Sequence, residues 1–296
     1  MKRPPYVTEA DLARIIRDGL SEDVLTGDVT TRATVLPSTT AEGRFIAKDT
    51  GTIAGLAVVE AVFSALDPSV SITWTATDGQ PVVPGMDIGR IAGPAIAVLE
   101  GERLALNLLQ RMSGIATATA AMVRAVHGTG ATILDTRKTV PGLRVLDKWA
   151  VRLGGGDNHR VGLHDMFLIK ENHIAAAGSL EAALDRVGAA AAQNALRIEI
   201  EVASMDELER VLAHGGAHRV MLDNFARRTR SSVDTTLLRE AVQRVGGRME
   251  TEASGNVDLD TVRAIAETGV DFISSGALTH SVRALDISLL LKTGTS

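Results

Sequence analysis

The chain has 296 residues, of which 45% are hydrophobic, 23% charged and only 3% aromatic, and its formal net charge is −5. This composition indicates a globular protein, and it argues against a nucleic-acid or anionic-membrane partner because the charge is negative and stacking residues are scarce. Cysteine is absent, which excludes disulfides, thiolate metal sites and cysteine nucleophiles. The sequence shows neither a secretory signal nor roughly 18 consecutive apolar residues, so we expect a cytoplasmic protein.

The first hundred residues predict a small α/β unit. Residues 9–20 have apolar positions at helical spacing, and Thr8 can cap that helix. Short β-like runs broken by Gly and Pro follow, with a helix at about 55–66 between them. The predicted strands are residues 43–47, 70–75 and 88–91. We expect an antiparallel sheet here.

A different rhythm begins after a long predicted helix from Gly101 to about His127. Short apolar runs recur, each followed by a polar turn and usually by a helix. We predict strands at residues 132–134, 166–169, 197–202, 219–222, 249–251 and 271–273. This repetition is typical of a parallel sheet and favours a (β/α) barrel, with an open doubly wound sheet as the alternative.

The last segment, 281–292, is predicted to be a helix that returns to the first domain. We therefore divide the chain into an amino-terminal domain, 1–115, joined by 281–296, and a catalytic domain, 116–280.

Polar residues close each of the six predicted strands. They are Asp135 to Lys138, Lys170 to His173, Glu199 with Glu201, Asp223 with Asn224, Glu252, and Ser274 to Gly276. A single charge at a strand end is usually a solvated turn. Six in succession favour an active site, because barrel enzymes gather their chemistry at the carboxyl ends of the strands.

Glu199 and Glu201 are two residues apart on one predicted strand, so both point to the same face. An unpaired buried carboxylate costs several kcal/mol. We therefore expect at least one of them to meet a cation, a metal or a substrate hydroxyl. An exposed edge strand is the alternative.

Two glycine turns follow the last two predicted strands. Ser254 to Asn256 precedes a predicted helix over 258–268, and Ser275 with Gly276 precedes a short turn and the final helix. Such turns let backbone N–H groups approach an anion, and phosphate sites in barrels often follow the last two strands. The pair favours a phosphate site.

Basic residues are concentrated between 137 and 173. They are Arg137, Lys138, Arg144, Lys148, Arg152, Arg160 and Lys170, with His159, His164 and His173. Arginine matches a carboxylate bidentately, whereas lysine acts as a point charge. The histidines lack metal-ligand spacing, and His159 is interpreted as a substrate contact or a structural residue. Nearby acids can hold magnesium through water. These residues predict a basic pocket for an acidic, phosphate-bearing substrate.

Taken together, these motifs resemble the quinolinate phosphoribosyltransferase family, also called nicotinate-nucleotide pyrophosphorylase (carboxylating). The resemblance covers roughly Glu22 to Ser288. It is carried by Glu22-Asp23, Gly27–Thr31, Glu102–Thr117, Leu134–Thr139, Gly155–Leu163, Lys170–Ile174, Ile198–Val202, Met221–Asn224, Glu252–Asn256 and Gly276–Ser281.

The resemblance implies a type II phosphoribosyltransferase fold, in which an amino-terminal α/β sandwich domain accompanies an incomplete (β/α) barrel. It implies a homodimer with shared active sites. The implied reaction transfers phosphoribose from phosphoribosyl pyrophosphate to quinolinate with decarboxylation. The products are nicotinate mononucleotide, pyrophosphate and CO₂, and Mg²⁺ is required.

The resemblance also assigns residues to each part of the site. The quinolinate positions are Arg103, which comes from the neighbouring subunit, and Thr136, Arg137, His159, Arg160 and Lys170. Lys138, Glu201 and Asp223 are the catalytic positions at the phosphoribosyl donor, and the two acids hold Mg²⁺ through water. The phosphate positions are Glu252, Ser254, Gly255, Asn256, Ser275, Gly276 and Ala277.

Three other functions compete with this interpretation. A Schiff-base aldolase or lyase would use Lys170 as its nucleophile. A non-catalytic binding protein would retain only the phosphate site, although Lys138, Glu201 and Asp223 are all present. A related enzyme with another acceptor would differ at Arg137, Arg160 or Lys170, and none of these departs from the family pattern.

Overall fold

The computed structural model describes residues 3–229 and 232–294, and the contacts divide the chain into two compact units. The first unit contains 1–120, 140–155 and 281–296; the second contains 121–139 and 156–280. The sequence-based division placed 140–155 in the second domain. In the structure this segment carries α5 (Arg144–Leu153) and belongs to the first unit, because the buried Asp147 accepts hydrogen bonds of 2.7 and 2.8 Å from Arg111.

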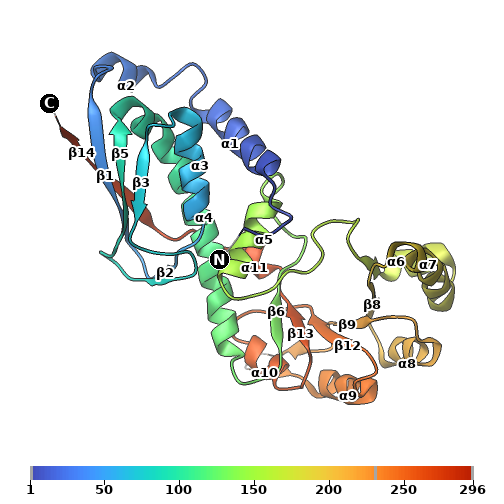
Figure 1. The fold of residues 1–296 in the computed structure, drawn as a ribbon. Helices are drawn as coiled ribbons and strands as arrows, with labels where there is room; N and C mark the ends of the chain where they lie inside the picture. The colour runs from blue at the N-terminus through green and yellow to red at the C-terminus, as the bar shows by residue number, and fades with distance from the viewer. Residues whose placement is uncertain (1–2, 230–231, 295–296) are drawn as a thin grey trace. The chain divides into compact units, whose positions relative to one another are not determined.

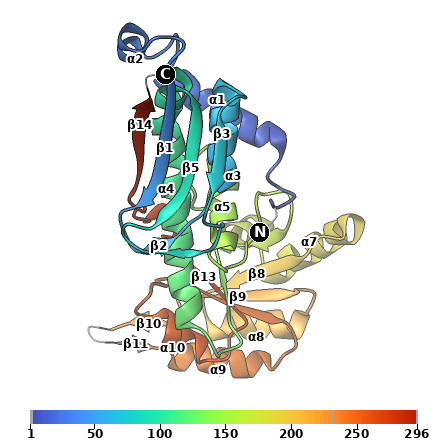
Figure 2. The same ribbon diagram turned by 60° about the vertical axis from the view of Figure 1, so that its left-hand side comes forward.

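The first unit is built on an antiparallel four-stranded sheet, as predicted, in the order β14-β1-β5-β3. Helices α3 and α4 lie along one face of this sheet (Figures 1 and 2). Its elements are α1 (Glu9–Asp23), α2 (Val29–Thr34), β1 (Thr40–Ala47), β2 (Gly51–Thr52), α3 (Leu56–Leu66), β3 (Ser71–Trp74), β4 (Pro81–Val82), β5 (Asp87–Pro94), α4 (Ala95–Ala125) and β14 (Ile287–Gly294).

The predicted final helix is wrong, because Ile287–Gly294 forms the strand β14. It pairs with β1 so that Leu289 lies opposite Phe45. Ile287 and Leu289 are buried and Leu290 is half exposed, which is the two-residue alternation of a strand. The leucine run at 289–291 concealed this alternation, since a short apolar run fits a helix equally well.

The second unit is built on six parallel strands in the order β6-β13-β12-β9-β8-β7, which confirms the six predicted strands and the incomplete barrel. Its elements are β6 (Thr132–Leu134), β7 (Phe167–Ile169), α6 (Glu171–Ala177), α7 (Leu180–Asn194), β8 (Ile198–Val202), α8 (Met205–His214), β9 (Arg219–Asp223), β10 (Arg227–Arg228), β11 (Val233–Asp234), α9 (Thr236–Val245), β12 (Glu250–Ser254), α10 (Val262–Ala266), β13 (Phe272–Ser274) and α11 (Ala277–His280).

The crossover helices begin where side chains can satisfy their first free N–H groups. Ser179 accepts from the N–H of Ala182 at the start of α7, and Ser204 does the same for α8 through Glu207. Helix α7 packs against β7 and β8, and α8 packs against β8, whereas α9 packs against β12 and α10 against β13 (Figure 1). The side chains at the carboxyl ends of the strands are therefore held on a rigid framework.

One predicted helix is much shorter than expected. The sequence predicted a helix over 258–268, but α10 contains only Val262–Ala266. Asp258 instead closes a turn, in which its carboxylate accepts from the backbone N–H groups of Asp260 and Thr261. The turn at Ser254 to Asn256 therefore does not open a helix directly.

The loop before β7 joins the two edge strands of the second unit. Asp157 forms an isolated parallel bridge with Leu134 on β6, and its N–H donates to the carbonyl of Ile133 at 2.8 Å. The chain reaches β7 at Phe167, at the opposite edge of the same sheet. The loop consequently spans the opening of the incomplete barrel and carries His159 and Arg160.

Within the described parts of the chain, 3–229 and 232–294, no helix combines the length and apolarity that a membrane span needs.

Candidate functional site

Two lysines and two acidic residues lie close together at the carboxyl ends of β6, β7, β8 and β9. Lys170, which follows β7, forms an ion pair with Glu201 on β8. Glu201 in turn lies close enough to Asp223, at the end of β9, to raise the pKa of that carboxyl, while Lys138 and Lys170 lower it. The structure therefore brings Lys138, Lys170, Glu201 and Asp223 together, and it confirms that Glu201 meets a cation.

The two acids of this group supply carboxylate oxygens, the ligand type that a hard cation prefers. Burial is the largest cause of the raised pKa of Asp223, and the charge of Glu201 is the second. Two neighbouring carboxylates repel each other, and a divalent cation relieves that repulsion. Magnesium prefers oxygen ligands and retains several waters, so the partly exposed Glu201 and Asp223 fit it.

Two arginines form a second positive region in the second unit. Burial and the nearby charge of Arg137 together lower the pKa of Arg160. The Nε of Arg137 is buried and has no hydrogen-bond partner within the described residues. Two guanidinium groups held close together favour a ligand with two negative charges, which each can bind in a planar fork.

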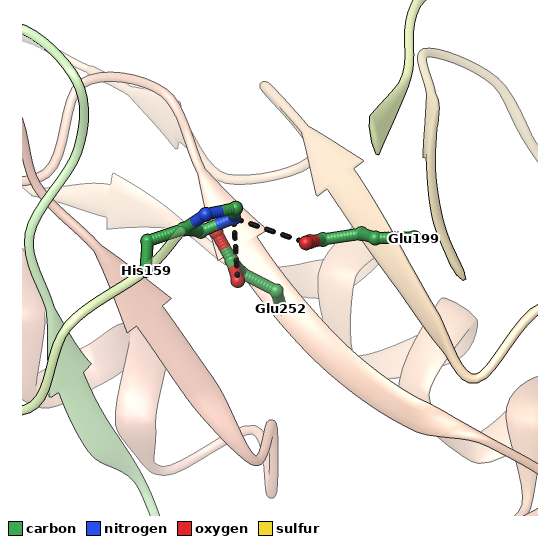
Figure 3. Close-up of side chains that lie close together, drawn as sticks. All are labelled: His159, Glu199 and Glu252. Atoms are coloured by element: carbon green, nitrogen blue, oxygen red, sulfur yellow. Dashed lines mark ion pairs between the residues drawn. The ribbon is translucent and has the colours of Figure 1, made fainter. Parts of the chain in front are cut away.

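His159 is held in the interior of the barrel rather than at its surface (Figure 3). Its side chain is buried, and its Nε2 lies 3.0 Å from Glu199 Oε2 and 3.6 Å from Glu252 Oε2. Its Nδ1 accepts the backbone N–H of Arg160 at 2.8 Å, so the neutral ring carries its proton on Nε2, facing the carboxylates. Nδ1 of His159 therefore fixes the backbone at Arg160, and Nε2 faces the carboxylates of Glu199 and Glu252.

The position of Glu252 corrects the prediction that this residue binds phosphate. Its side chain is fully buried, and its carboxylate accepts a 3.0 Å hydrogen bond from Arg219. Burial raises the pKa of Glu252 to about 7, with the charge of Glu199 as the second cause. Burial also raises the pKa of Glu199 to about 7. Because its side chain is fully buried against Arg219, Glu252 belongs to the interior of the barrel.

The two glycine turns lie at the ends of β12 and β13. Gly255 has a left-handed φ of 95°, and an added Cβ would lie 2.3 Å from Asn224 Oδ1. The hydroxyl of Ser275 is buried and donates to the carbonyl of Val257, so only backbone groups of that turn can approach a ligand. At Gly276 an added Cβ would lie 2.8 Å from the side chain of Lys138. Glycine therefore lets Lys138 lie directly over the second turn.

Arg103 lies in the first unit, on α4, with an exposed side chain. It lines a pocket of about 450 Å³ together with Arg14, Asn107 and the segment 140–143. The remaining predicted site residues all belong to the second unit. Of these, Thr136 accepts the backbone N–H of Lys138 at 3.1 Å and so shapes the first strand end.

Three supporting residues were not assigned from the sequence. The buried Asp135 accepts hydrogen bonds from the backbone N–H of His159 and from the side-chain amide of Asn158. Arg219 donates to the carboxylates of Glu250 and Glu252. Asn224 donates to the carboxylate of Asp223. Each stands within or next to a recognised motif. Arg219 could have been noticed because it is a charged residue at the start of the otherwise apolar strand 219–222.

The chain matches two family models that together cover most of its length. Residues 28–113 match the quinolinate phosphoribosyl transferase N-terminal domain, and residues 115–290 match the corresponding C-terminal domain. A quinolinate phosphoribosyltransferase [decarboxylating] from Nicotiana tabacum is 47% identical over 98% of this chain and 85% of that protein. A probable nicotinate-nucleotide pyrophosphorylase [carboxylating] from Bacillus subtilis is 41% identical over 94% of this chain and 92% of that protein.

Solved structures agree with these matches. NadC from Streptococcus pyogenes is 36% identical with a TM-score of 0.89, and covers 98% of this chain and 99% of its own. The nicotinate-nucleotide pyrophosphorylase from Francisella tularensis is 37% identical with a TM-score of 0.89, over 97% of this chain and 98% of its own. Human nicotinic acid phosphoribosyltransferase shares only the fold, with a TM-score of 0.58 and 14% identity.

The two-domain α/β fold, together with a lysine, two acids and glycine turns at the strand ends, defines a pentosyltransferase of the phosphoribosyltransferase type. The chain belongs to the quinolinate phosphoribosyltransferase family, the nicotinate-nucleotide pyrophosphorylases (carboxylating) of de novo NAD biosynthesis.

Proposed function

We propose that the chain transfers phosphoribose from phosphoribosyl pyrophosphate to quinolinate at the carboxyl ends of the strands of its second unit. The observation that carries this proposal is the division of the site into two charged regions. Arg137 and Arg160 bring two guanidinium groups close together in one region, although the charges of Asp165 and Glu199 also act on Arg160, whereas the other region combines Lys138 with the acids Glu201 and Asp223. A dicarboxylate acceptor suits the first region, and a ribose with an anionic leaving group suits the second.

At the donor, Lys138 would neutralise the pyrophosphate as the bond from C1′ to oxygen breaks and its electron pair leaves with that oxygen. The ribose then develops positive charge, which the carboxylates of Glu201 and Asp223 stabilise through space. Backbone N–H groups of the turns at Ser254–Asn256 and Ser275–Ala277 are the proposed cradle of the 5′-phosphate.

Magnesium is the proposed cofactor, held by Glu201 and Asp223 through water. When bound, it supplies positive charge to the leaving pyrophosphate. The chain's own contribution is to hold the two carboxylates side by side at the ends of the adjacent strands β8 and β9, where they are partly exposed.

At the acceptor, Arg137 and Arg160 would each hold one carboxylate of quinolinate, with Thr136 and Lys170 beside them. This orientation presents the ring nitrogen, a weak nucleophile, to C1′, so positioning supplies much of the rate. The nitrogen becomes positive after transfer. The positive nitrogen then stabilises the electron pair that remains on the ring carbon when the 2-carboxylate departs as CO₂, and that carbon takes up a proton with this pair.

A homodimer is proposed, with Arg103 reaching the site of the partner subunit to meet quinolinate. Arg103 belongs to the first unit, and its side chain is exposed there rather than buried in that unit's core, which supports a contact with another subunit. A cytoplasmic location remains a prediction, although some plant relatives carry names that place them in mitochondria.

A comparison of acceptors tests the proposed function. Purified protein is mixed with phosphoribosyl pyrophosphate, Mg²⁺ and either quinolinate or nicotinate, and nicotinate mononucleotide is quantified. We expect product from quinolinate and little from nicotinate, which lacks the second carboxylate for the arginine pair. Equal use of both acceptors would contradict the clamp, and no product from either would contradict the function. Borohydride trapping of a carbonyl compound on Lys170 would instead favour a Schiff-base enzyme.

A further inference from the structure

Asn224 links two parts of the proposed donor site that lie on neighbouring strands. It follows Asp223 at the end of β9, and its N–H donates to the carbonyl of Ser254 at 2.9 Å at the end of β12. Its side-chain Nδ2 donates to Asp223 Oδ2 at 2.7 Å, and its Oδ1 accepts from Asn256 Nδ2 at 3.1 Å. One side chain therefore contacts an acid of the ribose site and a residue of the phosphate turn.

The orientation of this amide follows from the chemistry of its partners. A carboxylate of Asp223 can only accept, so the NH₂ group of Asn224 must face it. The oxygen of Asn224 then faces Asn256, which must donate. The chain of hydrogen bonds from Asn256 through Asn224 to Asp223 has only this polarity.

The backbone around the chain of hydrogen bonds is strained. Asn224 and Asn256 both have left-handed φ values, 58° and 54°, which are uncommon for residues other than glycine. Asparagine tolerates this conformation better than most residues, and strained residues of this kind concentrate at functional sites. Gly255 lies directly against Asn224, because an added Cβ there would overlap the Asn224 amide.

We propose that Asn224 is a positioning residue for the phosphoribosyl donor: it fixes the Asp223 carboxylate relative to the Ser254–Asn256 turn, so that the ribose and the 5′-phosphate are bound in one geometry. The proposal rests on the proposed function for the identity of the donor. It predicts a defect at the donor and not at quinolinate, since the hydrogen bonds of Asn224 within the described residues join it to Asp223, Asn256 and Ser254, and not to Arg137 or Arg160.

The test compares Asn224→Gly with Ala195→Gly. Both substitutions place glycine at an exposed left-handed position, but Ala195 ends α7 and lies outside the site. For Asn224→Gly we expect the KM for phosphoribosyl pyrophosphate to rise roughly fivefold or more, with the KM for quinolinate and the melting temperature close to native. Ala195→Gly should leave both constants unchanged.

A double-mutant cycle with Asp223→Asn isolates the contact. If Asn224 acts through Asp223, its replacement should have little further effect once Asp223 is changed. Calorimetric titration of the protein with phosphoribosyl pyrophosphate measures the same coupling without turnover. An unchanged donor affinity in Asn224→Gly, or an equal rise in both KM values with a lower melting temperature, would overturn the positioning role. Native protein that binds the donor but never uses quinolinate would instead remove the proposed function.

Discussion

His159 Nε2 lies 3.0 Å from the carboxylate of Glu199, and both side chains are buried inside the incomplete barrel. The histidine comes from the loop that spans the barrel opening, whereas Glu199 is on β8. This contact, with the hydrogen bond from the Arg160 N–H to Nδ1, joins the loop to the framework of the sheet. The position of Arg160 thus depends on a buried network of His159 and Glu199.

The first prediction concerns the pH dependence of stability through Glu252. Its folded pKa of about 7 lies above the ordinary glutamate pKa of 4.5, so the folded protein binds the proton more tightly than the unfolded chain. The free energy of unfolding should therefore be highest below pH 4.5, as far as this group is concerned, and fall as the pH rises through 7. Glu252→Gln should reduce this fall by roughly 3 kcal/mol, since the pKa differs between 4.5 and about 7 and one pKa unit corresponds to about 1.4 kcal/mol.

Chemical unfolding at pH 5 and pH 8 measures this difference, with the exposed Glu267→Gln as the matched control. An identical pH dependence in native and Glu252→Gln protein would show that the buried acid does not titrate in this range.

The second prediction concerns the quinolinate clamp. Arg137→Ala and Arg160→Ala should each weaken quinolinate binding by roughly 2–3 kcal/mol, because a charged bidentate contact is lost. Affinity for phosphoribosyl pyrophosphate and the circular dichroism spectrum should stay close to native. Arg239→Ala, on the exposed side of α9, is the control. Near-normal quinolinate kinetics in either site variant would refute the clamp.

The third prediction separates backbone strain from close approach at Gly255. Gly255→Ala and Gly85→Ala both place alanine at a left-handed φ, which costs about 1–2 kcal/mol of stability. Only Gly255 is crowded, whereas a Cβ at Gly85 meets nothing within 4 Å. Gly255→Ala should therefore also raise the KM for phosphoribosyl pyrophosphate. Equal kinetics in the two variants would mean that the turn does not bind the donor.

The fourth prediction tests the shared active site. Arg103→Ala and Lys138→Ala should each be inactive alone as homodimers, and mixing them after subunit exchange should restore activity. Random mixing makes half of the dimers mixed, and each mixed dimer has one intact site of two, so roughly a quarter of all sites recover. No recovery, with exchange verified by mass spectrometry, would place Arg103 in its own subunit's site or outside any site.

The parallel strands and the residues at their ends were predictable because each strand is a short apolar run closed by a polar turn. The strand β14 was not, because three consecutive leucines, 289–291, hide a two-residue period and its partner β1 is more than 200 positions earlier in the chain. The burial of Glu252 was also hidden. A carboxylate that closes a strand looks the same in sequence whether it faces a ligand or, as here, an arginine such as Arg219.

The role of Asn224 depends on a register that the sequence does not state. Only the parallel pairing of Asp223 with Ser254 places the two asparagines side by side. Their left-handed backbone leaves no mark in the sequence beyond the choice of asparagine itself.

The most direct test of the central claim uses quinolinate labelled with ¹³C in its 2-carboxylate, together with phosphoribosyl pyrophosphate and Mg²⁺. We predict one labelled CO₂ for each nicotinate mononucleotide formed, and loss of both products in Asp223→Asn. Label retained in the nucleotide, or no nucleotide at all, would contradict the assignment of decarboxylating phosphoribosyl transfer to this site.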